Sequence, residues 1–255
     1  MDTAAAPRRP LRTVRRVLVV VVVVIALLAL AFGVYANTVS LGERDKALEV
    51  WNNPAIDVTV TDHSLVMTPT GAASGTGLVF IPGAKVEAGA YLYKLSGLVE
   101  EGGATVVITK PTLNLAFFDT RPLSTFEADA PEVESWLVGG HSLGGVRACQ
   151  LADDPDVDGL VLFGSYCAND LSDSDLSVLS IAGSNDGLST PEKIADARQN
   201  LPADATLIEI DGANHANFGD YGDQAGDGES TVPSETVRGT IADLFVKQFG
   251  DAVTP

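Results

Sequence analysis

The stretch Gly140-His141-Ser142-Leu143-Gly144 decides the fold of this chain. It is a G-x-S-x-G pentapeptide between the apolar residues 136–138 and the helix-forming residues 146–152, so the sequence predicts a strand, a tight turn and a helix in that order. Glycines two residues on either side of the serine remove side chains that would collide in the turn, and the N-terminus of the helix favours developing negative charge. The pattern indicates a nucleophile elbow with Ser142 as the nucleophile. A glycine-rich turn with an inert serine is the alternative.

A nucleophilic serine needs a histidine and an acid. Of the three histidines, only His215 lies downstream of Ser142, in the loop after the strand-like residues 206–210, where it can act as a general base. Asp186 follows the apolar residues 176–182 in a turn and is the predicted acid, with Asp211 as the next candidate. The resulting order of serine, acid and histidine is the order found in α/β-hydrolases, and it differs from that of chymotrypsin-type and subtilisin-type proteases.

From residue 77 to the C-terminus the sequence resembles the α/β-hydrolase superfamily, and most closely its small lidless members of the dienelactone-hydrolase-like type. Four motifs carry the resemblance: Val79-Phe80-Ile81-Pro82-Gly83, Gly140-His141-Ser142-Leu143-Gly144-Gly145, Gly183-Ser184-Asn185-Asp186, and Gly212-Ala213-Asn214-His215 followed by Phe218-Gly219-Asp220-Tyr221-Gly222. The resemblance implies a doubly wound, mostly parallel sheet and a serine hydrolase that needs no cofactor and no metal. Dienelactone hydrolase itself has a cysteine nucleophile, so its substrate is not implied here.

The same resemblance implies an oxyanion hole made of two backbone N–H groups. One belongs to Leu143, directly after the nucleophile, and the other to Ala84 in the loop after the first parallel strand, with Lys85 as the neighbouring alternative. Many family members carry His-Gly where this chain has Pro82-Gly83. The second donor therefore stays open between Ala84 and Lys85.

The N-terminal part predicts a membrane segment. Residues 17–34 are apolar and uncharged, and residues 1–16 contain five arginines. About 20 helical residues span the hydrocarbon layer, whereas the apolar core of a cleavable signal is typically about 7–15 residues long. We therefore expect a basic cytoplasmic segment at residues 1–16, a transmembrane helix or signal anchor at 17–36, and the rest of the chain outside the cytoplasm. Cleavage after Ala36 would instead give a secreted protein.

The charge of the chain limits the kinds of partner that it is expected to bind. The chain has 16 Lys and Arg against 34 Asp and Glu, a net charge of −18, and residues 1–16 hold five of the basic residues and only one acid. This acidic balance excludes nucleic acid as an expected partner and argues against a domain lying flat on anionic lipid.

Cys149 and Cys167 are the only cysteines. We expect Cys167 to lie at the opposite end of the helix from Cys149, which favours two buried thiols over a disulfide.

The pattern beyond residue 37 predicts one α/β domain at 56–255 after a connecting helical segment at 37–55, in which Ala47, Leu48 and Trp51 share a face. Residues 56–60 and 64–67 alternate with period two and predict a leading antiparallel hairpin. Compact apolar runs predict buried parallel strands at 78–81, 105–109, 136–138, 160–163, 177–181 and 206–210. Helices are predicted between and after them at 88–100, 146–152, 191–200 and 234–249.

Three segments allow more than one interpretation. Residues 113–118 are apolar and are expected to pack in the core, although they also fit the wall of a pocket. Residues 220–229 are rich in acids and glycines, but their spacing does not fit an EF-hand, so a rigid loop that holds His215 is favoured over a calcium site. Residues 165–175 are mostly polar and contain no bulky apolar flap, so we expect an open site.

Together these features predict an extracytoplasmic serine hydrolase, resembling a carboxylesterase, that acts on a small or soluble ester. Ser142, Asp186 and His215 form the predicted triad, and the N-terminal helix attaches the protein to the membrane. Two alternatives remain. An acyltransferase acting on an envelope component would use the same acyl-enzyme, and a non-catalytic envelope binding protein would retain only the fold.

Overall fold

The computed structural model describes residues 10–250 and divides into two units after Thr38. The first unit contains the single helix α1 (Pro10–Asn37), within which the most apolar window of 18 residues has a mean hydropathy of 3.4. The helix is long and apolar enough to cross a membrane, and a signal sequence has the same properties. Of the predicted basic segment, residues 1–9 lie outside the described part of the chain.

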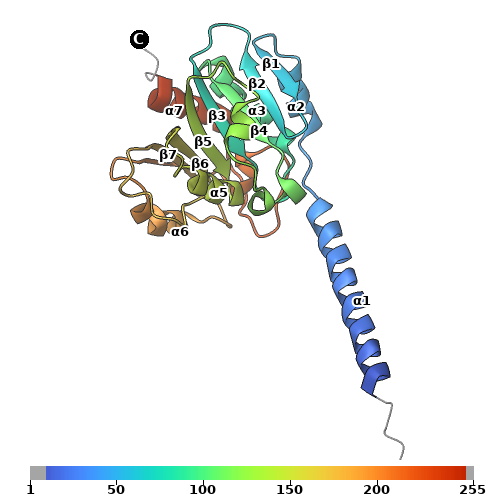
Figure 1. The fold of residues 1–255 in the computed structure, drawn as a ribbon. Coiled ribbons are helices and arrows are strands. Elements are labelled where there is room, and N and C mark those ends of the chain that lie inside the picture. Colours follow the sequence, from blue (N-terminus) through green and yellow to red (C-terminus); the bar gives the residue numbers. More distant parts are fainter. Residues whose placement is uncertain (1–9, 251–255) are drawn as a thin grey trace, which may run out of the picture. The chain divides into compact units, whose positions relative to one another are not determined.

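The second unit is built on one eight-stranded sheet (Figure 1) with the order β1-β2-β4-β3-β5-β6-β7-β8. The strands are β1 (Ile56–Val60), β2 (Ser64–Pro69), β3 (Thr76–Ile81), β4 (Thr105–Thr109), β5 (Ser135–His141), β6 (Val157–Phe163), β7 (Ser177–Gly183) and β8 (Thr206–Ile210). The pairs β1–β2 and β2–β4 are antiparallel and all other pairs are parallel. The predicted leading hairpin and parallel strands are confirmed.

Helices cover both faces of the sheet because successive side chains of a buried strand point to opposite sides. Leu78 and Phe80 of β3 belong to one apolar core, while Val79 and Ile81 belong to the other. The first core includes side chains of α2 (Arg44–Trp51), α3 (Leu92–Glu100) and α7 (Ser234–Phe249). The second lies under α5 (Leu143–Leu151), and α6 (Pro191–Asp196) packs near β7 (Figure 1). This is the doubly wound arrangement that the sequence predicts.

The remaining helices are short. They are α4 (Ser124–Glu127) and the 3₁₀ turns η1 (Ala88–Tyr91), η2 (Thr112–Asn114), η3 (Ala116–Phe118), η4 (Ala197–Asn200) and η5 (His215–Phe218). The predicted shared face of α2 is wrong in part, because Val50 is its buried residue while Leu48 and Trp51 are exposed. Helix α2 packs along α3, and an eight-residue helix buries only one narrow stripe there.

The prediction of core packing for residues 113–118 is correct only in part. Ala116 is buried, but Leu113, Phe117 and Phe118 are exposed. The chain makes two tight turns here, and Leu113 and Asn114 both adopt positive φ angles of 57° and 55°. Those turns direct the apolar side chains away from the sheet.

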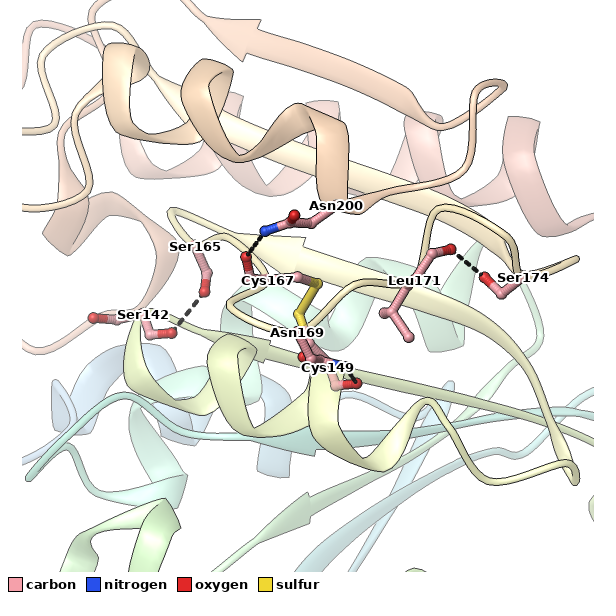
Figure 2. The surroundings of a disulfide bond; sticks show 8 residues. All are labelled: Ser142, Cys149, Ser165, Cys167, Asn169, Leu171, Ser174 and Asn200. Carbon is pink, nitrogen blue, oxygen red and sulfur yellow. Dashed lines mark hydrogen bonds between the residues drawn. A yellow bond between two sulfur atoms is a disulfide. The ribbon is translucent and has the colours of Figure 1, made fainter.

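The two cysteines form a disulfide, contrary to the sequence-based prediction (Figure 2). After β6 the chain turns back along α5, so that Asn169 Nδ2 donates to the carbonyl of Cys149 at 3.0 Å. The Cα atoms of Cys149 and Cys167 are therefore 5.5 Å apart. Asn200 Nδ2 also donates to the carbonyl of Cys167, which fixes this loop to η4. The expectation failed because it placed Cys167 at the end of β6 and ignored the returning loop.

We expect reduction of this disulfide to lower the free energy of unfolding. The bond closes a loop with a sequence separation of 18, which corresponds to about 3 kcal/mol of lost chain entropy in the unfolded state. Urea unfolding of the wild type, with and without reductant, measures the effect. The variant Cys149→Ala/Cys167→Ala is the control, since reductant must leave its unfolding curve unchanged. An equal curve for oxidised and reduced wild type would contradict the prediction.

Candidate active site

Ser142 occupies the turn between β5 and α5 with φ 54° and ψ −124°. A positive φ is strained for a residue other than glycine, and such strain is typical of a nucleophile elbow. The turn is held by hydrogen bonds to both the N–H and the carbonyl group of Ser142. Ser142 N donates to Phe163 O at 3.1 Å, and Ser142 O accepts from Ser165 Oγ at 2.7 Å (Figure 2). The sequence-predicted nucleophile therefore lies on the predicted type of turn.

Two glycines of the motif are required by close backbone contacts. A Cβ atom on Gly140 would lie 2.5 Å from the carbonyl carbon of Gly144, and one on Gly144 would collide with the carbonyl oxygens of Ile81 and Pro82. The start of α5 therefore packs directly against the loop after β3, with no room for a side chain between them. As a result, the N–H groups that follow Ser142 lie next to the loop that carries the second predicted oxyanion donor.

His215 and Asp186 form a buried hydrogen-bonded pair, with 2.7 Å between Nδ1 and Oδ2. Asp186 lies in the turn after β7, and its second oxygen accepts the N–H groups of Leu188 at 2.8 Å and Ser189 at 2.7 Å. His215 begins η5 after β8. Since Nδ1 is taken by Asp186, Nε2 is the nitrogen left to exchange a proton, and it has no hydrogen-bond partner among the described residues.

The His215 ring lies against the residue that precedes Ser142. Its centroid is 4.4 Å from that of His141, and a Cβ on Gly164 would lie 3.2 Å from His215 Nδ1. Gly164 directly follows Phe163, the residue whose carbonyl binds Ser142 N. The structure thus brings the three candidates to the same end of the central strands. No hydrogen bond joins Ser142 and His215 in the described structure.

The loop after β3 offers one N–H group without an acceptor. Gly83 N donates to Tyr91 Oη at 2.9 Å, and Lys85 N donates to the carbonyl of Asn114 at 2.8 Å. Between them, the N–H of Ala84 meets no acceptor among the described residues. Leu143 is the first residue of α5, so its N–H has no acceptor within the helix. Ala84 and Leu143 are therefore better placed than Lys85 to bind an oxyanion.

His141 and Tyr91 connect the nucleophile strand to the same loop. Tyr91 Oη lies 2.9 Å from His141 Nδ1, in addition to accepting from Gly83. Burial, followed by the nearby His215, holds the pKa of His141 well below its usual range, and burial raises the pKa of Tyr91. Both groups are therefore uncharged at neutral pH. Sequence reasoning missed Tyr91, because nothing local marks it within an apolar helical segment.

Asp211 and His63 do not belong to this site. Asp211, the alternative acid, is exposed and approaches Ser184 Oγ at 3.4 Å. His63 pairs with Asp129 at 3.2 Å near the β1–β2 turn. Within residues 10–250, no group of three or more His, Cys, Asp or Glu side chains is arranged to hold a metal ion.

One pocket in the described structure has a volume of about 550 Å³, and its lining does not include the triad. Its walls combine apolar residues of α2, the β1–β2 hairpin and η1 with Lys110 and Asn114. Its lining also includes residues 86–89, which follow the loop after β3. Of residues 113–118, only Asn114 lines this pocket, which is not the site of the predicted triad.

A family model described as the alpha/beta hydrolase family matches residues 77–239. The chain belongs to this family. A search among curated proteins gives no match. The fold of this α/β-hydrolase is also shared with several solved structures. The esterase domain of a Rhodothermus marinus protein aligns with a TM-score of 0.57 and 14% identity over 76% of this chain and 98% of that chain.

Two further esterase structures align with this α/β-hydrolase at a similar level. Est1E from Butyrivibrio proteoclasticus, in a complex with ferulic acid, has a TM-score of 0.52 and 11% identity over 78% of this chain and 98% of that chain. A cold-adapted esterase from an Arctic intertidal metagenomic library has a TM-score of 0.51 and 13% identity, over 77% and 96% of the two chains. These similarities show a common fold.

Proposed function

We propose that this α/β-hydrolase is a serine esterase that hydrolyses a small or soluble ester outside the cytoplasm. The observation that carries the proposal is the buried Asp186–His215 pair, whose imidazole has a free Nε2 and packs with 4.4 Å between ring centroids against His141, the residue before Ser142. The esterases among the structural neighbours support an ester over other acyl substrates. The polar loop at residues 165–175 is held down by the disulfide, which fits an open site.

The proposed mechanism uses each group in turn. His215 Nε2 accepts the hydroxyl proton of Ser142 as Ser142 Oγ attacks the ester carbonyl. Asp186 stabilises the resulting imidazolium. The N–H groups of Ala84 and Leu143 donate to the tetrahedral oxyanion. The imidazolium then protonates the leaving alcohol. Water, activated by His215, hydrolyses the acyl-enzyme and restores Ser142.

A fluorophosphonate probe tests this proposal against a non-catalytic role. Such a probe phosphonylates an activated serine, so we expect labelling of the wild type, located at Ser142 by peptide mass spectrometry. A folded wild-type protein that takes up no label would support a binding protein. Release of p-nitrophenol from esters of increasing chain length, with no added alcohol, measures acyl preference. Turnover in water alone distinguishes a hydrolase from an acyltransferase.

The extracytoplasmic location rests on the N-terminal sequence and on the disulfide. Arginines before an apolar helix keep the N-terminus in the cytoplasm, and disulfides persist mainly outside it. We propose that α1 is an uncleaved anchor, with the catalytic domain outside.

We expect the full-length protein to sediment with membranes and to resist extraction by carbonate. A protein beginning near Asn37 should remain soluble and hydrolyse a water-soluble ester at the wild-type rate, because α1 forms a unit separate from the sheet domain. Fractionation and external protease treatment measure the location. A mature N-terminus at Asn37 in the culture medium would show instead that Val34-Tyr35-Ala36 is a cleavage site.

A further inference from the structure

The segment between η5 and α7 carries a carboxylate that accepts four backbone N–H groups. Asp227 Oδ1 accepts from His215 at 3.1 Å, from Gly187 at 3.1 Å and from Gly228 at 2.8 Å, and Oδ2 accepts from Ala216 at 2.9 Å. His215 and Ala216 begin η5, where N–H groups have no acceptor within the turn. The carboxylate therefore supplies the acceptor that the first turn of η5 lacks.

The same carboxylate connects the two turns that hold the catalytic pair. Gly187 directly follows Asp186, so Oδ1 of Asp227 binds both the residue that carries the imidazole and the neighbour of the acid that orients it. Asp186 and His215 come from the turns after β7 and β8, which are separate loops. A single oxygen atom thus fixes the distance between their backbones.

Close contacts around Asp227 reinforce this connection. A Cβ on Gly187 would lie 2.6 Å from the carbonyl oxygen of Gly226, and one on Gly228 would collide with the carbonyl oxygen of Asn185. Asn185 Nδ2 also donates to the carbonyl of Glu229 at 2.9 Å. The segment around Asp227 is therefore packed directly against the turn of the catalytic acid.

The histidine side is held in the same way. Asn214, the N-cap of η5, donates from Nδ2 to the carbonyl of Gly228 at 2.8 Å. The start of this segment is fixed independently, because Asp220 binds the buried Lys94 at 3.0 Å. Asp227 lies further along the segment and binds back to the N–H groups of His215 and Ala216.

We infer that Asp227 is a positioning residue that sets the Asp186–His215 hydrogen bond by binding the backbones of both turns. This inference rests on the proposed function. It also assigns a role to the acidic segment 220–229 that differs from metal binding, since both oxygens of Asp227 are engaged by N–H groups. Of its other acids, Asp223 is exposed and makes no hydrogen bond in the described structure.

The test compares Asp227→Asn, Asp227→Glu and the control Asp223→Asn in the full-length protein in detergent. An asparagine must turn its NH₂ group toward at least one backbone N–H group, and a glutamate keeps the charge but is one methylene too long. A misplacement of about 1 Å at a catalytic group costs about 10²-fold in rate. We expect kcat for a p-nitrophenyl ester to fall by that factor in both Asp227 variants with KM unchanged, and Asp223→Asn to match the wild type.

A second readout separates positioning from a general structural role. The His215 Nδ1 proton, hydrogen-bonded to Asp186, gives a downfield proton resonance, which we expect to shift or broaden in both Asp227 variants. An unchanged resonance in either folded variant, or wild-type kcat in Asp227→Glu, would overturn the inference. If Asp227→Asn does not fold, Asp227→Glu still provides both measurements. If the wild type is inactive but its downfield resonance still shifts or broadens in both Asp227 variants, the proposed esterase is refuted and the positioning role is retained.

Discussion

Replacement of Ser142 with alanine is expected to lower kcat by about 10⁶-fold, the loss seen when the nucleophile of a serine hydrolase triad is removed. The structure supplies the reason. Ser142 is the residue whose positive φ presents it at the turn, and His215, whose ring packs against the preceding His141, has an Nε2 without a hydrogen-bond partner among the described residues. Without the hydroxyl, no acyl-enzyme forms, and only binding and the oxyanion donors remain.

The design of this experiment uses the non-additivity of triad residues. Once Ser142 is absent, His215 has no proton to accept, so Ser142→Ala/His215→Ala should be no slower than Ser142→Ala alone. The exposed Ser172 provides a matched control, and Ser172→Ala should keep wild-type kcat. Initial rates with a p-nitrophenyl ester measure all four proteins. Retention of more than about one per cent of kcat in Ser142→Ala would place the nucleophile elsewhere.

The second large effect is expected for Asp186→Asn, at about 10⁴-fold in kcat with the fold intact. Oδ1 of Asp186 accepts two backbone N–H groups, so the amide oxygen of an asparagine must occupy that position. The amide NH₂ group then faces His215 Nδ1 and donates to it. The imidazole is forced into the tautomer with its proton on Nε2, which cannot accept the proton of Ser142.

Asp211→Asn is the matched control, because Asp211 lies four residues before His215 and is exposed. It should leave kcat unchanged, and both variants should keep the thermal unfolding midpoint close to that of the wild type. Steady-state kinetics over a range of substrate concentrations measure kcat and KM separately. Wild-type turnover in Asp186→Asn, with loss in Asp211→Asn, would exchange the roles of the two acids.

The sequence allowed most of the fold to be predicted, because a sheet buried on both faces leaves compact apolar runs. All eight strands lie where such runs or alternating patterns occur. The candidate triad could also be predicted from the sequence, since Ser142, Asp186 and His215 each follow the carboxyl end of a strand. The carboxyl ends of parallel strands lie at the same end of the sheet. Chain order and the small number of histidines then left His215 as the base, with Asp186 as the predicted acid and Asp211 as its alternative.

Features that depend on loop paths could not be predicted. The disulfide requires the chain after β6 to return along α5, and the exposed Phe117 and Phe118 follow a turn in which two residues, Leu113 and Asn114, have positive φ. Asp227 gives no signal in sequence, because aspartates are common in glycine-rich loops. Its partners are backbone N–H groups from two other turns, which only the folded chain brings together.

The strand order also determines when a working centre exists during synthesis. The nucleophile strand β5 lies in the middle of the sheet, whereas the acid and the base follow β7 and β8 at one edge. Since parallel strands pair only after their crossover segments have been made, His215 is the last of the three to reach its place. A nascent chain that has completed the central strands therefore carries the serine without its base. If the three residues act as proposed, such a chain is inert toward esters until its C-terminal strand and helix have folded.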